Sequence, residues 1–251
     1  MTTDGERAHA AWRRYCERLL EMGDRLMAPE FPGDDRDRVE GFRHLATQTS
    51  GWTAWSVGYA DAAFPAFWRQ NDLVMCWGGP NVDQVTRRAR IDPTRTYRIT
   101  GELGACEDFI LTLKNGDMHA GKYGIGHEVM ASELGYAAGD TIDIVLSAEP
   151  QAGNWVPIPA DATMLNVREY YWNWTPRPPA LLTIECVDTR GESPDALVAD
   201  GFATMLDEAG GLVESSVVYW NDWVEAERAK LPPNTLGPPA GAAGGSSRIR
   251  Y

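Results

Sequence analysis

The stretch Met164–Trp174, which reads MLNVREYYWNW, decides the fold that the sequence predicts. Successive side chains of a strand point to opposite faces, so every second residue shares a face. One face then carries Leu165, Val167, Glu169 and Tyr171, and the other carries Asn166, Arg168, Tyr170, Trp172 and Trp174. The pattern predicts a strand with a largely apolar side and a side of polar and aromatic groups.

Further strands are predicted around this stretch. The apolar run Phe109–Leu113 leads into Asn115-Gly116, a pair that favours a hairpin because both residues tolerate positive φ. Thr141–Ser147 alternates apolar and polar residues, and Ala180–Asp188 follows a proline-rich turn. Several short strands without helices between them are typical of an antiparallel β-sandwich.

Both ends of the chain predict helices, so the expected fold class is α+β. Residues 8–27 and 36–49 place apolar side chains at three-to-four spacing, whereas Trp52–Trp77 has no clean period and is expected to be irregular. Ser193-Pro194-Asp195 is typical of a helix start, and Gly210-Gly211 predicts a break before the helical pattern resumes to Lys230.

Four segments follow from these patterns. They are N-terminal helices (1–50), a β-sandwich domain (51–190), C-terminal helices (191–232) and a linker with a tail (233–251). Residues 237–247 contain almost no large apolar side chain, and Arg248–Tyr251 alternates basic and apolar residues. We expect this tail to pair with a strand of the same or a neighbouring subunit, which predicts a homo-oligomer or a partner chain.

The charge balance excludes some classes of partner. Lys and Arg number 23 against 36 Asp and Glu, which gives a net charge of −13. Such a chain repels phosphate backbones and anionic membrane surfaces, so neither nucleic acid nor a membrane is expected as a partner. No secretory signal is visible, and the four cysteines are far apart, so reduced thiols and a cytoplasmic location are predicted.

Two segment pairs resemble a known family. The first is Trp77–Asp83 (WGGPNVD) with Tyr97–Gly101 (YRITG), and the second is Gly153–Pro159 (GNWVPIP) with Val167–Trp174 (VREYYWNW). Together they are similar to the bacterial domain of unknown function 1214 family. The resemblance implies a jelly-roll-like sandwich over residues 70–188, relatives that continue beyond Tyr251, and no established catalytic residues.

The outer side of the Met164–Trp174 strand suggests a binding surface. Arg168, Tyr170 and Trp172, with Trp155 nearby, could hold a flat or glycan-like ligand by stacking and hydrogen bonding. The alternative is that these rings only cover the sandwich and that Arg168 pairs with an acid.

A glycine-rich region holds two of the four histidines. His127 and Glu128 are the candidate pair for general acid–base catalysis, and packed or exposed side chains are the alternative. His119 and His127 match no strong metal signature, so we expect no bound metal and no cofactor.

The sequence therefore supports two hypotheses about function. The first is a β-sandwich that binds a small apolar, aromatic or glycan-like molecule, as an enzyme or an accessory to one. The second is a protein–protein interaction module, or a subunit of a larger assembly, with an aromatic contact surface. The ligand, the reaction and the oligomeric state do not follow from the sequence.

Overall fold

The computed structural model describes residues 2–29, 31, 33–70, 74–77, 81–173, 178–235 and 237. The chain divides into two compact units. The helical unit comprises residues 1–60, 72–78 and 195–238, and the sandwich unit comprises residues 61–71, 79–194 and 239–251. The predicted tail strand, Arg248–Tyr251, lies outside the described residues, so its pairing stays a prediction.

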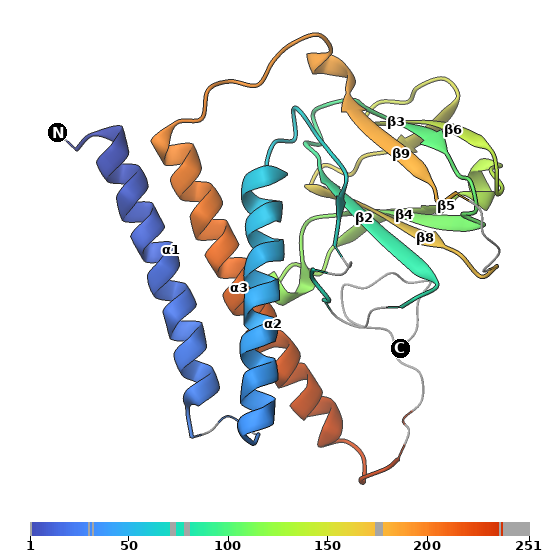
Figure 1. Cartoon of the computed structure of the whole chain (residues 1–251). Coiled ribbons are helices and arrows are strands. Elements are labelled where there is room, and N and C mark those ends of the chain that lie inside the picture. The colour runs from blue at the N-terminus through green and yellow to red at the C-terminus, as the bar shows by residue number, and fades with distance from the viewer. Residues whose placement is uncertain are drawn as a thin grey trace. The chain divides into compact units, whose positions relative to one another are not determined.

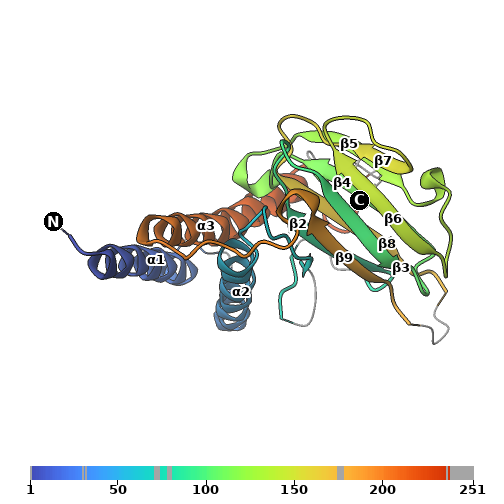
Figure 2. The ribbon, with the colours of Figure 1, turned by 90° about the horizontal axis from the view of Figure 1, so that it is seen from above.

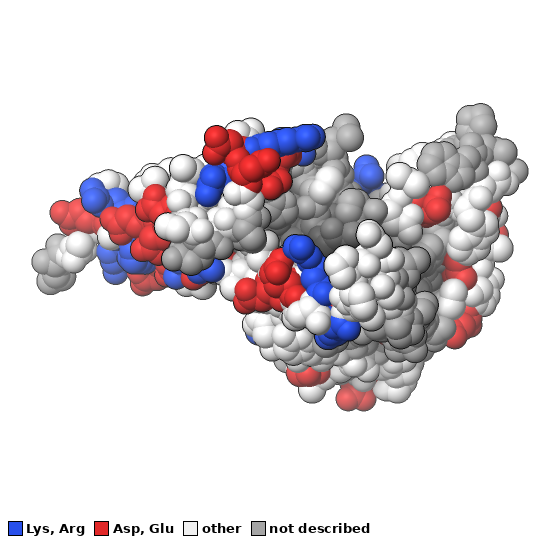
Figure 3. Space-filling model, turned by 90° about the horizontal axis from the view of Figure 1, so that it is seen from below, with Lys and Arg blue, Asp and Glu red and all other residues white. Residues whose placement is uncertain are grey.

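Three long helices form the helical unit, and Figures 1 and 2 show α1 and α3 side by side. Helix α1 spans Asp4–Met27, α2 spans Asp35–Thr53 and α3 spans Ala199–Arg228. A capping box begins each of the first two helices. The side chains of Thr3 and Asp34 accept backbone N–H groups of the first turn, and the carboxylates of Glu6 and Asp37 accept the N–H groups of Thr3 and Asp34. Basic and acidic side chains lie beside each other on this unit's surface (Figure 3), partly as pairs three residues apart such as Arg43 with Glu40.

Helix α3 corrects the prediction of a break at Gly210-Gly211, because it runs through both glycines without interruption. The physical reason is close packing. A side chain at Gly210 would bring its Cβ to 3.0 Å from Cδ of Arg18 and 3.5 Å from the ring of Tyr15 on α1. The glycines let the two helices approach each other, and Ala11 and Tyr15 pack there with Leu206 and Ala209.

Two other helix boundaries differ from the prediction. Helix α3 begins at Ala199 rather than at Ser193, because residues 191–198 are exposed and offer no buried apolar face to stabilise a helix. Trp52 lies inside α2 rather than in irregular structure, and a π-helical turn, Ala54–Gly58, continues it. The indole of Trp52 is buried and donates to Gln48 and Ser216, which fixes this end of α2.

The sandwich unit consists of two sheets, which form an upper and a lower layer in Figure 1. The five-stranded sheet has the order β1-β2-β8-β4-β5, and the four-stranded sheet has the order β7-β6-β3-β9. The first sheet contains β1 (Trp68–Arg69), β2 (Gln84–Arg90), β8 (Met164–Tyr170), β4 (Asp108–Lys114) and β5 (Ile125–Met130). The second contains β7 (Asn154–Pro157), β6 (Thr141–Ser147), β3 (Tyr97–Glu102) and β9 (Leu181–Cys186).

This architecture confirms the predicted α+β fold, a β-sandwich with helices before and after it in the chain. One detail differs: β6 and β7 are parallel, so the four-stranded sheet is mixed rather than purely antiparallel. Inward side chains of both sheets form one apolar core, for example Leu111, Leu165 and Val167 from one sheet and Ile99 and Ile144 from the other. The predicted hairpin after Leu113 is also confirmed, since β4 pairs antiparallel with β5 across residues 115–124.

Strand β8 ends four residues earlier than the predicted stretch. Its alternation is as predicted: Leu165, Val167 and Glu169 are buried, whereas Asn166, Arg168 and Tyr170 point to the other face. Beyond Tyr170 the backbone N–H groups of Trp172 and Asn173 donate to the carboxylate of Glu107, at 2.8 Å and 3.1 Å. This side-chain acceptor replaces a strand partner, so Trp172 lies past the strand.

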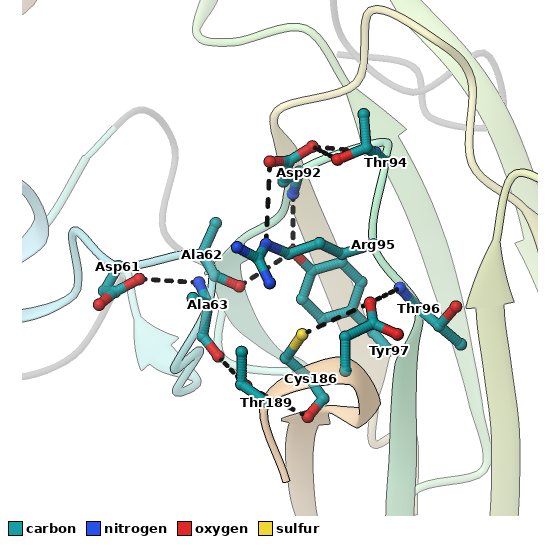
Figure 4. A network of polar contacts seen from close by, with 11 residues as sticks. Asp61, Ala62, Ala63, Asp92, Thr94, Arg95, Thr96, Tyr97, Cys186 and Thr189 are labelled. Atoms are coloured by element: carbon teal, nitrogen blue, oxygen red, sulfur yellow. Dashed lines mark hydrogen bonds and ion pairs between the residues drawn. The ribbon is translucent and has the colours of Figure 1, made fainter. Parts of the chain in front are cut away.

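Tyr97 holds the segment at residues 61–63 to the sandwich (Figure 4). Its buried hydroxyl donates to the carbonyl of Ala62 at 2.9 Å and accepts the N–H of Asp92 at 2.8 Å. Thr189 donates to the carbonyl of Ala63 at 2.6 Å. Burial raises the pKa of Tyr97, so its hydroxyl remains a donor over the physiological range.

A buried ion pair lies on the inner side of the five-stranded sheet. Arg87 contacts Glu169 with 2.5 Å between Nε and Oε1, and Glu169 is fully buried. Tyr171 donates to the other carboxylate oxygen, at 2.5 Å, and accepts the N–H of Ala180. Arg87 also donates to the carbonyl of Ala180, at 2.7 Å, so the network joins β2 and β8 to the residue that precedes β9.

We predict that Arg87→Met lowers the free energy of unfolding by about 3–5 kcal/mol, because it leaves a buried carboxylate without its cation. The matched control is Arg98→Met, which removes an ion pair with Asp143 at the surface and should cost about 1 kcal/mol or less. Urea unfolding monitored by circular dichroism measures both values. Equal losses for the two variants would contradict a special role for the Arg87 network.

Candidate functional site

A row of polar side chains crosses the outer side of the five-stranded sheet. Arg88 of β2 lies opposite Asn166 of β8, Asn166 lies opposite Thr112 of β4, and Thr112 lies opposite Glu128 of β5. Directly opposed residues have Cβ atoms about 5 Å apart. Thr112 donates a 3.3 Å hydrogen bond to Glu128.

Charged residues extend this row in both directions along the strands. Arg168 lies two residues from Asn166 on β8, and Lys114 lies two residues from Thr112 on β4. Asp117 and His119 come from the connection that follows β4. We call this set the polar face: Arg88, Thr112, Lys114, Asp117, His119, Glu128, Asn166 and Arg168.

An ion pair brings the connection after β4 onto the sheet. Arg88 is 0% exposed, and its guanidinium lies 2.6 Å from Oδ2 of Asp117. The same guanidinium lies 5.8 Å from the ring centroid of Trp68 on β1 and contacts the sulfur of Met164. Arg88 is therefore enclosed by side chains from β1, β8 and the connection.

The connection itself is held by its own hydrogen bonds. Asn115 accepts the N–H of Gly124 at 3.0 Å, and the carbonyl of Asp117 accepts the N–H of Lys122 at 3.1 Å. Gly116, with φ of 145°, and Gly121, with φ of 74°, adopt backbone conformations that favour glycine. The Asn-Gly pair thus forms part of a longer turn that places Asp117 over the sheet.

Burial and charge together set the ionisation of the polar face. Burial opposes the ionised form of Asp117, but Arg88 and the other cations nearby outweigh it and hold the pKa of that carboxyl below its usual range. Burial lowers the pKa of Lys114, and the positive charges of Arg88 and Arg168 lower it further. The carboxylates of Asp117 and Glu128 act in the opposite direction. Burial likewise lowers the pKa of His119 to about 4, so this imidazole is neutral at pH 7.

On strand β8, Nε of Arg168 and Oδ1 of Asn166 are buried without a hydrogen-bond partner. Most buried polar atoms in folded proteins are hydrogen-bonded, so each exception calls for an explanation. One is a donor and the other an acceptor, and both project from the same side of β8, two residues apart.

The structure places only some of the predicted site residues together. Arg168 and Tyr170 point outward from β8, and the ring of Tyr170 lies 6.0 Å from that of Trp172, which is 61% exposed. Trp155 belongs to β7 in the other sheet, where its indole donates to Ser147 Oγ at 3.0 Å. Trp155 is therefore not part of the polar face.

His127 and Glu128 are consecutive in β5 and point to opposite faces of the sheet. Glu128 lies opposite Thr112 on the polar face, whereas His127 lies opposite Leu113 on the core side. His119 is on the polar face, so the two histidines do not share a face either. Among the described residues, no group of three or more His, Cys, Asp and Glu is arranged to hold a metal ion.

Sequence reasoning missed Arg88, Lys114 and Asn166 as site residues. In the sequence, Arg88 belongs to a short basic run, Arg87-Arg88-Ala89-Arg90. Ala89 is buried, and Arg88 and Arg90 on either side of it point to the opposite face of β2. That alternation was the available signal. Its pairing with Asp117, 29 residues away, depends on strand order and has no local signature.

The fold and the polar face define a two-sheet sandwich protein with a buried charged surface. An uncharacterised protein from Burkholderia cenocepacia has a similar solved structure, with a TM-score of 0.82 and 30% identity, over 92% of this chain and 63% of that chain. The chain thus spans under two thirds of that protein's length. The VPA0106 protein from Vibrio parahaemolyticus matches with a TM-score of 0.32 and 12% identity, over 62% of this chain and 39% of that chain.

Two other comparisons gave no match. No family model matches the chain, and no curated protein matches it. None of the helices in the described ranges is both long enough and apolar enough to span a membrane.

We predict a stability change with pH that originates at His119. Its pKa is about 4 in the folded protein against an ordinary value of 6.5. As the pH falls from 7 to about 4, His119 of the unfolded chain binds a proton that the folded protein does not bind. The free energy of unfolding therefore falls, and the complete loss from this one group is about 3 kcal/mol.

The variant His119→Gln should lose this component, so its unfolding free energy falls less between pH 7 and pH 4 than that of the unchanged protein. The matched control is His9→Gln, at an exposed position of α1. Urea titrations across this pH range give the difference. Parallel pH profiles for the unchanged protein and His119→Gln would contradict burial of a neutral imidazole.

Proposed function

We propose that the polar face binds a small polar molecule that carries an anionic group, and that the sandwich is a small-molecule-binding domain. The observation that carries this proposal is the pair of buried, unpaired atoms on β8, Nε of Arg168 and Oδ1 of Asn166. A buried donor without a partner costs about 1–3 kcal/mol, which a ligand acceptor would offset.

The local charge supports an anion. Arg88, Lys114 and Arg168 carry three positive charges against the two carboxylates of Asp117 and Glu128, with His119 neutral at pH 7. This excess occurs inside a chain whose net charge is −13. Arg88 is committed to Asp117, which leaves Lys114 and Arg168 as the cations placed for a ligand.

The side chains also indicate the form of the ligand. Arg168 presents an N–H donor for an oxygen anion, and Asn166 presents an acceptor for a hydroxyl or amino group. A carboxylate with a hydroxyl nearby, as in a sugar acid, satisfies both at once. This proposal narrows the apolar, aromatic or glycan-like ligands expected from the sequence to the glycan-like class.

Acid–base catalysis on this face is a further part of the proposal. Glu128 would act as the acid or base, with Thr112 as its hydrogen-bond donor, and Lys114 is a second titratable group with a lowered pKa. His127 would act only from the opposite side of the sheet. The interaction-module alternative would use an aromatic contact surface, for which the exposed ring of Trp172 beside Tyr170 is the candidate, and a tail that lies outside the described residues.

Two related proposals accompany this one. We propose membership of the domain of unknown function 1214 family, supported by the sandwich that the resemblance implies. We also propose a cytoplasmic location, supported by the buried thiols of Cys106 and Cys186, neither of which is in a disulfide.

The ligand proposal predicts a selective response to small anions. Glucuronate, citrate and inorganic phosphate, each at up to about 10 mM, should be compared with neutral glucose by thermal shift and isothermal calorimetry on the full chain. At least one anion should bind saturably, and glucuronate should bind better than glucose because only it supplies an acceptor anion for Arg168.

Arg168→Gln should weaken the binding at least tenfold, since a charge-assisted hydrogen bond contributes roughly 1.5–3 kcal/mol. Arg98→Gln, on the outer side of the other sheet, should leave it unchanged. Absence of any saturable anion binding, or equal binding by the Arg168→Gln protein, would contradict the proposal.

A further inference from the structure

The helical unit contains a hollow between its three helices. Its volume is about 210 Å³. Apolar side chains from all three helices line it, among them Met22, Leu26, Leu45, Val217 and Trp220. The polar residues Glu40, His44 and Asn221 line it as well. Met22, Leu26, Leu45 and Val217 are almost completely buried, so the walls belong to the packed interior of the unit.

A second hollow, of about 500 Å³, adjoins the first. The two share Leu26, Phe31, Val217 and Asn221 as lining residues. The larger one is also lined by charged residues, Arg25, Asp222 and Glu225, and these give it a polar rim. The smaller hollow therefore has mostly apolar walls with a few polar lining residues, an arrangement typical of small-molecule sites.

Trp220 lines this hollow and carries one polar atom in its indole ring. Its Nε1 atom is buried and has no hydrogen-bond partner. The indole ring is held by edge contacts with Trp77, Tyr219 and Trp223, at centroid distances of 5.3, 5.2 and 5.7 Å. A buried indole N–H usually has a partner, so a fixed ring with an unpaired donor points to an acceptor from outside the chain.

We propose that this hollow is a second binding site, for a small apolar molecule with a single ring and one hydrogen-bond acceptor. The volume agrees with this size, because an apolar cavity of about 150 Å³ in another protein binds benzene. The acceptor would pair with Nε1 of Trp220 while the ring contacts Leu26, Leu45 and Val217. This site is independent of the polar face and lies in the other unit.

The test uses fluorine NMR on the full chain with two probes, 4-fluoroacetophenone and fluorobenzene. Both fit the apolar walls, but only the ketone supplies an acceptor. Both probes should bind saturably, and the ketone should bind about five times more tightly, as expected for one neutral hydrogen bond. Trp220→Phe keeps an aromatic ring and removes the donor, so the ketone should lose its advantage while fluorobenzene still binds.

A second pair of variants tests the location. Asn221 is exposed and lines both hollows, so Asn221→Phe should obstruct the site and abolish the binding of both probes without altering the core. Asn221→Ala is the matched control and should bind as the unchanged protein does. Circular dichroism confirms that each variant is folded. Failure of both probes to bind, or binding that Asn221→Phe leaves unchanged, would overturn the proposal.

Discussion

The sandwich depends on the register of strand β8. All seven of its residues pair with β2 on one side and with β4 on the other. Because side chains alternate along a strand, a slip of one residue would exchange its two faces. Leu165 and Val167 would then leave the core, and Asn166 and Arg168 would enter it. The apolar core and the polar face are thus two consequences of one register.

Strand β2 shows the same constraint with charged residues. Arg87 and Arg88 are consecutive, so they point to opposite sides of the sheet, and each meets its own carboxylate, Glu169 on the inner side and Asp117 on the outer side. Burying a charge is costly unless it is paired and hydrogen-bonded. The inner pair satisfies both conditions and joins two strands to the start of β9. On the outer face, the polar face carries three cationic side chains against two carboxylates. This excess of positive charge supports a binding role rather than a purely structural one.

Local patterns in the sequence predicted much of this fold. The alternation in Met164–Tyr170 and in Thr141–Ser147 correctly predicted strands, because a half-buried strand shows its two faces in the order of its residues. The errors arose where a distant partner overrides a local signal. Glu107 ends β8 before Trp172 by accepting its N–H group, and α1 packs against Gly210, which keeps α3 continuous.

The candidate site was only partly predictable for the same reason. Alternation alone places Arg168 on the outer face. It also predicts that the consecutive residues His127 and Glu128 of β5 point to opposite faces. The row from Arg88 to Glu128 required the order β2-β8-β4-β5, which no local pattern contains. Trp155 appeared close to Arg168 in the chain, yet it lies in the other sheet.

The central claim is that Nε of Arg168 is a buried donor available to a ligand, and NMR of the arginine Nε–Hε groups tests it directly. The signal of Arg168, assigned with Arg168→Lys, should shift when glucuronate is added, while that of Arg98, already paired with Asp143 at 2.7 Å, should not. An Arg168 signal that stays unchanged at saturating glucuronate, or one that exchanges with water as fast as an exposed arginine does, would contradict this account.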